Sequence, residues 1–183
     1  MIGSQELKEF GREDLNRIIS YMTNINFFVD ATVEEFLNLY ISDYQINQTK
    51  ANEYIKECDL EKVLFQERDG LDTYLYDNAS NLSGGEKQRL SLLLAFMKDA
   101  KIRIFDEALN QVDAQTLFAI LSFFDKCAET ILFSSHYIDR QICMLFDAII
   151  VMKDGKIYRQ GTFNELCQDP YFKKLFKENI WRK

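Results

Sequence analysis

The strongest constraint on the fold comes from the run L-S-G-G-E-K-Q-R at residues 82–89, which leads into an apolar segment. Ser83 can accept a hydrogen bond from a backbone N–H at a helix start, and Glu86 can reach back to the N–H of Ser83. A helix is therefore expected to begin here. Gly84 and Gly85 lower helix propensity in its first turn, which indicates that something contacts the backbone there. Exposed N–H groups and the positive end of the helix dipole favour a phosphate.

The same run resembles the signature motif of ATP-binding cassette (ABC) ATPases. In that family the signature contacts the γ-phosphate of an ATP molecule held by the opposite subunit. The resemblance therefore implies that Ser83, Gly84, Gly85 and Glu86 bind the ATP of a partner cassette.

Two apolar segments that follow the signature end in polar residues. Residues 101–105 are typical of a buried parallel strand and lead into Asp106 and Glu107, and residues 130–135 lead into His136, the single histidine of the chain. The carboxyl ends of such strands are where α/β proteins carry ligands. Taken alone, the acids could also be a solvated helix cap, and a lone histidine is more often structural than catalytic.

The order of these segments after the signature resembles the Walker B motif and the switch histidine of ABC ATPases. By that resemblance, Asp106 would hold Mg²⁺ through water, because magnesium prefers oxygen ligands and dehydrates reluctantly. Glu107 would be the general base for the hydrolytic water, and His136 would contact the γ-phosphate. Asp113 matches the aspartate of the family's D-loop, through which two ATP sites communicate. Asn24 stands at the position of the Q-loop glutamine, which touches the magnesium ion, and carries the same amide on a stem one methylene shorter.

Local patterns predict further elements. Thr32 with Glu35, and Thr162 with Glu165, form capping-box pairs that predict helix starts. Asp-Gly at 154–155 lies between two β-forming runs and predicts a hairpin. Helices are also expected over about 49–58, 60–66, 115–127 and 171–180. The helix over 115–127 is expected to turn these side chains inward: Leu117, Phe118, Ile120, Leu121 and Phe124.

The order of elements resembles an ABC exporter cassette from its Q-loop to its end. The implied fold class is α/β: a partial, P-loop NTPase-like ABC ATPase cassette with a parallel sheet core, an inserted helical subdomain and a C-terminal β-hairpin. We expect the helical subdomain over about 32–98. The core with Walker B, D-loop and switch histidine is expected over about 99–161, and the C-terminal helices over about 162–183.

Composition excludes some classes of function. The formal charge is −7, from 29 acidic and 22 basic residues, so broad electrostatic binding of nucleic acid is not expected. The four cysteines show no metal-site spacing and are expected to be reduced thiols. No run reaches the ~18 to 20 apolar residues of a membrane-spanning helix, and the start does not have the pattern of a signal peptide.

One element of the family does not occur in the 183 residues. The P-loop pattern G-x-x-x-x-G-K-[ST], whose backbone N–H groups and lysine cradle phosphates, is absent. We therefore expect an N-terminally truncated cassette that does not hydrolyse ATP by itself, and whose unpaired strand edges make it poorly soluble in isolation.

The resemblance implies a function at a membrane. The chain would be the ATPase portion of an ABC exporter, with ATP and Mg²⁺ as cofactors, a second ABC cassette in a homo- or heterodimer as partner, and an exporter transmembrane domain that holds it at the cytoplasmic face of the cell membrane. Exporter specificity lies in transmembrane segments that these residues do not include.

Two other functions stay open at this point. One is the C-terminal half of an SMC/Rad50-type DNA-repair ATPase, which also carries a signature, a Walker B motif and a histidine without a P-loop. The acidic charge, the Q-loop-like segment and the lack of preceding coiled-coil heptads disfavour it. The other is a non-catalytic truncated cassette that dimerises with an intact one.

Overall fold

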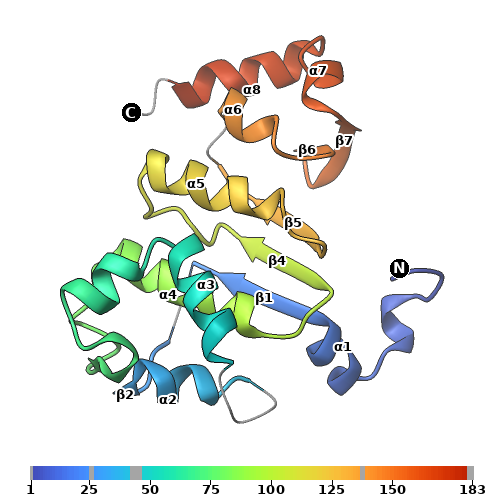
Figure 1. The fold of residues 1–183 in the computed structure, drawn as a ribbon. Coiled ribbons are helices and arrows are strands. Elements are labelled where there is room, and N and C mark those ends of the chain that lie inside the picture. Colours follow the sequence, from blue (N-terminus) through green and yellow to red (C-terminus); the bar gives the residue numbers. More distant parts are fainter. Residues whose placement is uncertain (1, 25–26, 42–46, 137–138, 181–183) are drawn as a thin grey trace.

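A three-stranded parallel sheet lies at the centre of the computed structural model, which describes residues 2–24, 27–41, 47–136 and 139–180 (Figure 1). The strand order is β1 (Ile19–Thr23), β4 (Ile102–Asp106), β5 (Thr130–Ser134). The predicted parallel core is therefore confirmed. In this register Thr23, Asp106 and Ser134 lie side by side, so the three strands end together at one edge of the sheet.

Helices and short strands connect these three strands. The chain begins with a 3₁₀ turn (Leu7–Glu9) and α1 (Arg12–Ile18). The long connection from β1 to β4 contains β2 (Ala31–Thr32), α2 (Val33–Asn38), α3 (Gln48–Glu57), a π-helical turn (Lys62–Gln66), a 3₁₀ turn (Gly70–Asp72), β3 (Tyr74–Leu75) and α4 (Gly84–Met97). Helix α5 (Ala114–Phe124) connects β4 to β5. The remaining elements are α6 (Arg140–Cys143), β6 (Ile149–Lys153), β7 (Lys156–Gly161), α7 (Phe163–Leu166) and α8 (Pro170–Ile180).

One face of the central sheet packs against α4 and α5. Met22 and Phe105 are buried on this face, and the Ser20 hydroxyl donates to the carbonyl of Ala95 in α4 at 3.1 Å. The ring of Phe105 stacks on Phe124 of α5 with the centroids 4.9 Å apart. The apolar core of the molecule therefore lies between the sheet and these two helices.

Arg103 lies on the same buried face of β4 and is 1% exposed. Its guanidinium donates to the carbonyl of Ala95, to the carbonyl of Lys98 at 3.3 Å and to Glu129 Oε1 at 2.8 Å. It also lies 4.8 Å from the ring centroid of Phe96. The central strand thus carries a buried charge that is paired with a carboxylate.

The C-terminal segment forms a second, smaller core. Strands β6 and β7 pair antiparallel, and Asp154 and Gly155 connect them with φ of 50° and 73°, which confirms the predicted hairpin. Among the residues whose burial is described, the buried apolar side chains of this core are Val151, Phe163, Leu166 and Phe172. In Figure 1 this unit lies beyond β5, and its strands are not hydrogen-bonded to the central sheet.

A short left-handed turn precedes the signature helix α4. Asp77, Asn78 and Ala79 all have positive φ, of 50°, 54° and 53°. The Asn78 side chain accepts from the N–H of Phe28 at 2.8 Å, and the Asn78 carbonyl accepts from Lys87 Nζ at 2.8 Å. The turn is therefore tied to the segment after β1 and to the first turns of α4.

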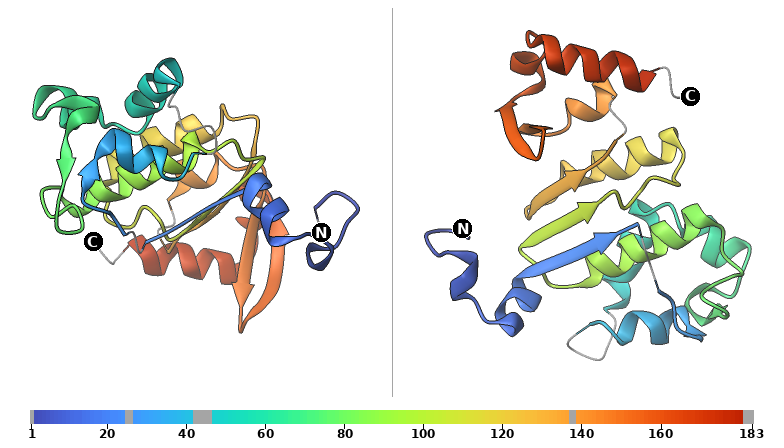
Figure 2. Two further views of the ribbon diagram at one scale, coloured as in Figure 1. Left: turned by 90° about the horizontal axis from the view of Figure 1, so that it is seen from below. Right: turned by 180° about the vertical axis from the view of Figure 1, so that it is seen from behind.

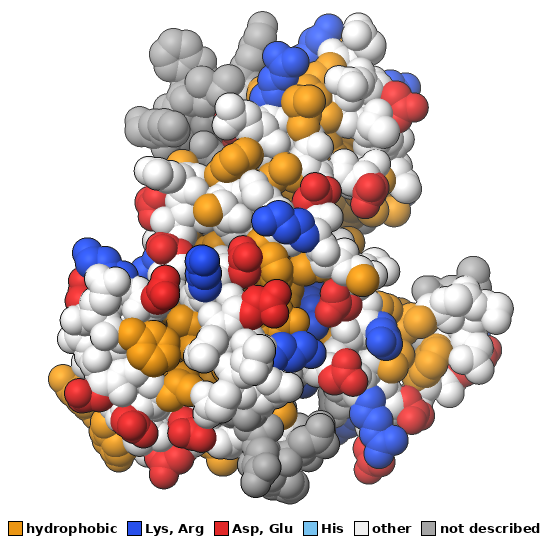
Figure 3. Space-filling view, viewed as in Figure 1, with side chains coloured by type: hydrophobic (Ala, Val, Ile, Leu, Met, Phe, Trp, Pro, Cys, Tyr) orange, Lys and Arg blue, Asp and Glu red, His pale blue; other side chains and the backbone are white. Residues whose placement is uncertain are grey.

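The surface over the helices carries charges of both signs, interspersed rather than separated (Figure 3). Within the parts of the chain that the structure places, no helix combines the length and the apolar character needed to cross a membrane.

Most local predictions are confirmed, and the orientation of one residue is wrong. Both sides of the capping boxes at Thr32 and Thr162 are present. The helical segment predicted over about 60–66 is present as a π-helical turn at Lys62–Gln66, with the N–H of Glu67 bonded to the carbonyl of Lys62 at 3.2 Å. Phe118, predicted to face inward, is 38% exposed on the outer side of α5.

Candidate functional site

The carboxylate of Asp106 lies at the carboxyl end of β4, held by hydroxyl groups from both neighbouring strands. Ser134 Oγ donates to Asp106 Oδ1 at 2.6 Å, and Tyr21 Oη donates to Asp106 Oδ2 at 3.2 Å. The hydrogen bond to the Asp106 carboxylate, together with burial and the carboxylate's charge, raises the pKa of Tyr21. Each oxygen of Asp106 thus has a donor, while the side chain stays exposed to solvent.

Glu107 follows Asp106 with a left-handed backbone, φ 50°. Its N–H lies within hydrogen-bond distance of both oxygens of Ser134, the carbonyl at 3.2 Å and Oγ at 3.1 Å. His136 Nε2 lies 2.6 Å from Glu107 Oε1, and the imidazole is 85% exposed. The structure therefore brings Asp106, Glu107 and His136 together at the ends of β4 and β5, with the Glu107–His136 pair facing solvent.

The donor set at this edge suits a hard cation. Asp106 and Ser134 offer oxygen atoms, the ligands that Mg²⁺ prefers. Over the described ranges, His, Cys, Asp and Glu form no group of three or more that could hold a metal by itself. A magnesium ion here would complete its shell with water and phosphate oxygens, which is how it is usually held beside a nucleotide.

Asn24 lies at the same edge of the sheet. It comes directly after β1, and its neighbour Thr23 is in register with Asp106. Its side chain is exposed. The structure thus places Asn24, the predicted Q-loop position, beside the strand end that carries Asp106 and Glu107.

The start of α4 has the capping box that the sequence predicts. The N–H of Glu86 donates to Ser83 Oγ at 3.3 Å, and the N–H of Ser83 donates to Glu86 Oε2 at 2.9 Å. Ser83 and Gly84 are exposed, whereas Gly85 and Glu86 are half-buried. The first turn of α4 therefore presents its backbone to solvent mainly at Ser83 and Gly84.

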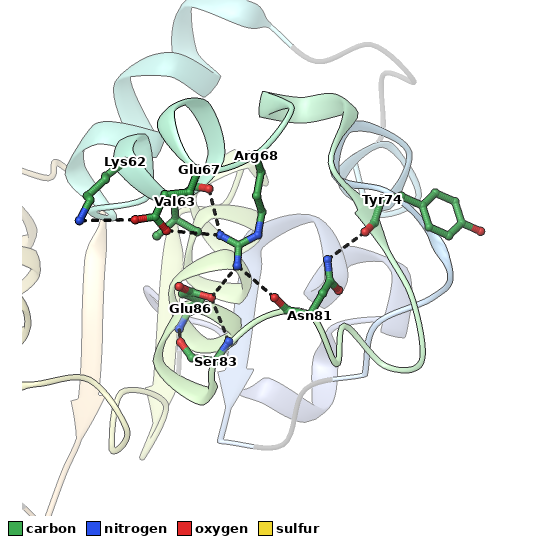
Figure 4. A network of polar contacts seen from close by, with 8 residues as sticks. All are labelled: Lys62, Val63, Glu67, Arg68, Tyr74, Asn81, Ser83 and Glu86. Carbon is green, nitrogen blue, oxygen red and sulfur yellow. Dashed lines mark hydrogen bonds and ion pairs between the residues drawn. The ribbon is translucent and has the colours of Figure 1, made fainter.

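Arg68 fixes this helix start to the preceding helical segment (Figure 4). Its guanidinium donates to the carbonyls of Val63 at 3.1 Å and Asn81 at 3.0 Å, and to Glu86 Oε2 at 3.4 Å. Glu86 is thus shared between the helix cap and Arg68.

The glycines of the signature have a close neighbour in the same chain. A Cβ on Gly84 would overlap the side-chain oxygen of Gln111, and one on Gly85 would lie 3.1 Å from the Gln111 carbonyl. Gln88 Nε2 donates to Asn110 Oδ1 at 2.6 Å, and the N–H of Gln111 donates to Gln88 Oε1 at 2.8 Å. The loop after Glu107 therefore packs directly on the first turn of α4.

Asp113 caps helix α5. Its Oδ1 accepts from the N–H of Thr116 at 3.0 Å and from the N–H of Gln115 at 3.1 Å. These hydrogen bonds, with the one from Thr116 foremost, lower the pKa of Asp113. Asp113, the predicted D-loop aspartate, thus has a structural role within this chain.

The candidate residues form two groups on the carboxyl side of the sheet. One is the strand-end group, Asp106, Glu107 and His136 with Asn24 beside it; the other is the start of α4, Ser83 to Glu86. The loop from Glu107 to Asp113 joins them. Sequence reasoning missed Tyr21, Ser134 and Gln111. Strand alternation could have placed Tyr21 and Ser134 on the face of Asp106, but only once the register was known.

Comparisons with known proteins find similarity to ABC transporter proteins. A family model described as ABC transporter matches residues 1–110. The lactococcin transport/processing ATP-binding protein LcnC-like of Lactococcus lactis subsp. lactis (strain IL1403) is 30% identical over 179 residues, which is 96% of this chain and 24% of that protein. The microcin-J25 export ATP-binding/permease protein McjD of Escherichia coli is 31% identical over 164 residues, 87% of this chain and 27% of that protein.

Solved structures show the same fold. The structure of a bacterial Atm1-family ABC exporter with ATP bound superposes with a TM-score of 0.85 at 23% sequence identity, over 97% of this chain and 31% of that one. The chain spans about a quarter of the length of the curated relatives named above.

Proposed function

Because this chain belongs to the ABC transporter family, we propose that residues 1–183 work as the part of an ABC exporter cassette that runs from the Q-loop position to the C-terminal helices. The family is one of ABC-type ATPases, and the fold is that of an ABC ATPase with a parallel sheet and a C-terminal hairpin. We divide the chain into a helical subdomain (about 32–98), a core (about 99–161) and C-terminal helices (about 162–183). The named relatives are transporters, which favours an exporter over a DNA-repair ATPase.

The pairing of Glu107 with His136 carries the proposal. Their side chains meet 2.6 Å apart at the end of two adjacent parallel strands, open to solvent on the side where ligands bind in α/β sheets. Glu107 would take the proton of the water that attacks the γ-phosphate, and His136 would orient Glu107 and contact the phosphate. Phosphoryl transfer needs mainly such positioning and charge stabilisation from a protein.

Asp106 and Asn24 would complete the strand-end group. When bound with the nucleotide, Mg²⁺ neutralises charge on the phosphate oxygens. Asp106 would hold it through water, oriented by the hydroxyls of Ser134 and Tyr21. Asn24 would contact the same ion from the end of β1.

The start of α4 would serve the ATP of a second cassette, in a homo- or heterodimer. Ser83 and Gly84 are exposed at the positive end of a 14-residue helix, which suits a γ-phosphate. The Ser83 hydroxyl and the N–H of Gly84 would be the donors, because the N–H of Ser83 is bonded to Glu86. Gly85 and Glu86 would shape this turn, and Asp113 would link the two ATP sites. ATP binding would bring the cassettes together and hydrolysis would release them, moving a transmembrane exporter domain from the cytoplasmic face of the membrane.

Residues 1–183 alone are proposed to be inactive, because they contain no phosphate-cradling P-loop. In a phosphate-release assay with Mg-ATP, the purified chain should release phosphate no faster than its own Glu107→Gln variant. Activity of the chain alone that disappears in Glu107→Gln would contradict the proposed inactivity.

A chimaera tests the catalytic roles directly. A strand, P-loop and helix from an intact ABC exporter cassette would be fused ahead of residue 1, and ATP hydrolysis should then appear. Loss of the general base should lower kcat by about 10²–10⁴-fold in Glu107→Gln. Glu53→Gln, on the exposed side of α3, is the matched control and should leave kcat unchanged. A chimaera in which Glu107→Gln keeps full activity would show that Glu107 is not the base.

A further inference from the structure

One buried glutamine joins the signature helix to the loop that follows the acid pair. Gln88 lies at the beginning of the second turn of α4 and is 2% exposed. Its Nε2 donates to Asn110 Oδ1 at 2.6 Å, and its Oε1 accepts from the N–H of Gln111 at 2.8 Å. This loop runs from the end of β4 to the start of α5 and can be followed in Figure 2. Both polar groups of the Gln88 amide therefore bond to one loop.

The direction of these two hydrogen bonds is fixed by the backbone. The N–H of Gln111 can only donate, so the oxygen of the Gln88 amide faces it and the NH₂ group faces Asn110. The Asn110 amide must then turn its oxygen toward Gln88. An apolar side chain at position 88 would make neither bond, and a carboxylate would make only one. The loop therefore requires an amide at this position of α4.

The loop held by Gln88 begins at Glu107. Glu107 has a left-handed backbone, which a residue keeps only when the structure around it holds it there. On one side its N–H is bonded to Ser134. On the other side Ala108 and Leu109 are buried, and the next two residues are the ones bonded to Gln88. Ser134 and Gln88 are thus the polar anchors before and after the glutamate.

The same loop rests on the first turn of α4. Gln111 Oε1 would lie 1.9 Å from a Cβ on Gly84, so its side chain packs directly on that glycine. Gly84 and Gln88 are four residues apart and therefore lie on one face of the helix. The face of α4 that begins at the signature is the face that holds the loop.

We propose that Gln88 is a positioning residue, which sets the path of residues 108–112 so that the Glu107 carboxylate stays against His136. The proposal rests on the proposed function, in which Glu107 activates water and the start of α4 meets the ATP of a second cassette. When α4 docks on that ATP, Gln88 carries the shift of the helix into the loop and so adjusts Glu107 in the chain's own site. Gln88 is buried and acts only through the loop.

The single histidine of the chain reports the position of Glu107 in residues 1–183. His136 Nε2 lies 2.6 Å from Glu107 Oε1, so the ring-proton NMR signals of His136 depend on that carboxylate and should move in Glu107→Gln. Gln88→Met keeps the length of the side chain but makes neither hydrogen bond. It should move the signals in the same direction and speed exchange of the Gln111 amide by about tenfold or more. Gln48→Met, the same change at an exposed position of α3, should alter neither.

Asn110 supplies variants at an exposed position, where folding is not at risk. Asn110→Asp keeps an acceptor for Gln88 Nε2 and should leave the His136 signals in place, whereas Asn110→Leu removes the acceptor and should move them part of the way. The double variant of Gln88→Met with Asn110→Leu should move them no further than Gln88→Met alone, because both substitutions break one link. Fully additive shifts would overturn the proposal.

Kinetics of the chimaera described above separate positioning from stability. Gln88→Met should lower kcat by about 10- to 100-fold, because a small misplacement of the base is costly. The KM for ATP should change by less than about twofold, since the capping box and Arg68 still hold the start of α4. A lower melting temperature with unchanged kcat and unchanged His136 signals would reduce Gln88 to a structural residue and overturn the proposal.

The two hypotheses fail in different ways. If Glu107→Gln leaves the chimaera fully active, the proposed catalytic role is wrong, and the His136 signals of Gln88→Met in residues 1–183 still decide whether Gln88 positions the glutamate. If Glu107→Gln abolishes hydrolysis but Gln88→Met does not lower kcat, the catalytic role stands and the role of Gln88 is refuted.

Discussion

Arg103 shows how a single buried residue can link the core to the pH dependence of stability. It is enclosed between the central sheet and α4, and its guanidinium pairs with the carboxylate of Glu129. Burial raises the pKa of Glu129, but the hydrogen bond from Arg103, a backbone N–H and the positive charge of Arg103 outweigh it and hold the pKa below its ordinary value. The carboxylate therefore stabilises the folded state in its charged form.

Glu129→Gln should lower the free energy of unfolding at about pH 7 by about 1–3 kcal/mol, because it leaves the buried guanidinium with a neutral partner. Since the folded-state pKa of Glu129 is lowered, its contribution is fully present above the ordinary glutamate pKa of about 4.3 and is lost as the pH falls through the folded-state value. Urea unfolding at a series of pH values measures this. The difference from wild type should shrink on acidification, whereas a difference that stays constant would assign the effect to packing.

At the residue scale, the sequence predicted the strand-end acids and the histidine because each follows an apolar run. The contacts of Tyr21, Ser134 and Gln111 were not predictable in the same way, since they depend on the register of strands about 80 and 30 residues apart in the chain and on the path of a loop. Gln111 also changes the interpretation of the signature glycines. Because these glycines have no side chain, the loop after Glu107 can approach α4 closely. The same lack of a side chain would also let a phosphate approach the backbone.

At the element scale, the position of helix α4 depends on one arginine. Arg68 binds two backbone carbonyls and the capping residue Glu86, and its side chain is 22% exposed. It connects the π-helical turn, the loop before the signature and the first turn of α4.

Arg68→Met keeps much of the aliphatic volume but removes every one of these hydrogen bonds. It should lower the free energy of unfolding by about 2–3 kcal/mol and speed amide exchange in the first turn of α4. Lys62→Met is the control, because its ion pair with Glu67 is exposed and worth about 0–1 kcal/mol. Denaturant unfolding and hydrogen exchange measure both. Equal effects of the two substitutions would mean that Arg68 does not hold the helix start.

Element starts were more predictable than element types. Capping boxes and the Asp-Gly turn act over four residues, so the sequence contains all of their determinants. The helix type over 60–66 was not predictable, and the predicted orientation of Phe118 was wrong, because both depend on packing beyond a short local pattern. Burial of Leu60, Val63 and Leu64 fits either an α- or a π-helical turn over so short a run, and Phe118 follows Leu117 about 100° further around α5, beyond the edge of the buried face.

At the scale of the whole molecule, two cores of unequal size set the order of unfolding. The larger one joins the central sheet to α2, α3, α4 and α5, whereas the described part of the C-terminal core buries only four apolar side chains beside a two-stranded hairpin. A small core protects its hydrogen bonds less.

Amides of β6 and β7 should therefore exchange faster than those of β4 in native-state hydrogen exchange. Phe172→Ala removes a ring that contacts Phe163 and Phe176, with centroids at 6.2 and 5.9 Å. It should lower the local stability of residues 149–176 by about 3–4 kcal/mol and leave the protection of β4 unchanged. Equal loss of protection in both regions would show that the chain unfolds as one unit.

The left-handed turn at Asp77, Asn78 and Ala79 has a mechanical consequence. A left-handed conformation costs most L-amino acids roughly 1–2 kcal/mol, whereas Asp and Asn tolerate it better, so Ala79 carries the largest conformational cost in this turn. Two hydrogen bonds hold this turn in place: the N–H of Phe28 donates to the Asn78 side chain, and Lys87 Nζ donates to the Asn78 carbonyl. If the segment after β1 moved away and broke the hydrogen bond from Phe28 to Asn78, this turn would be free to relax, and the start of α4 at Ser83 lies only four residues after Ala79.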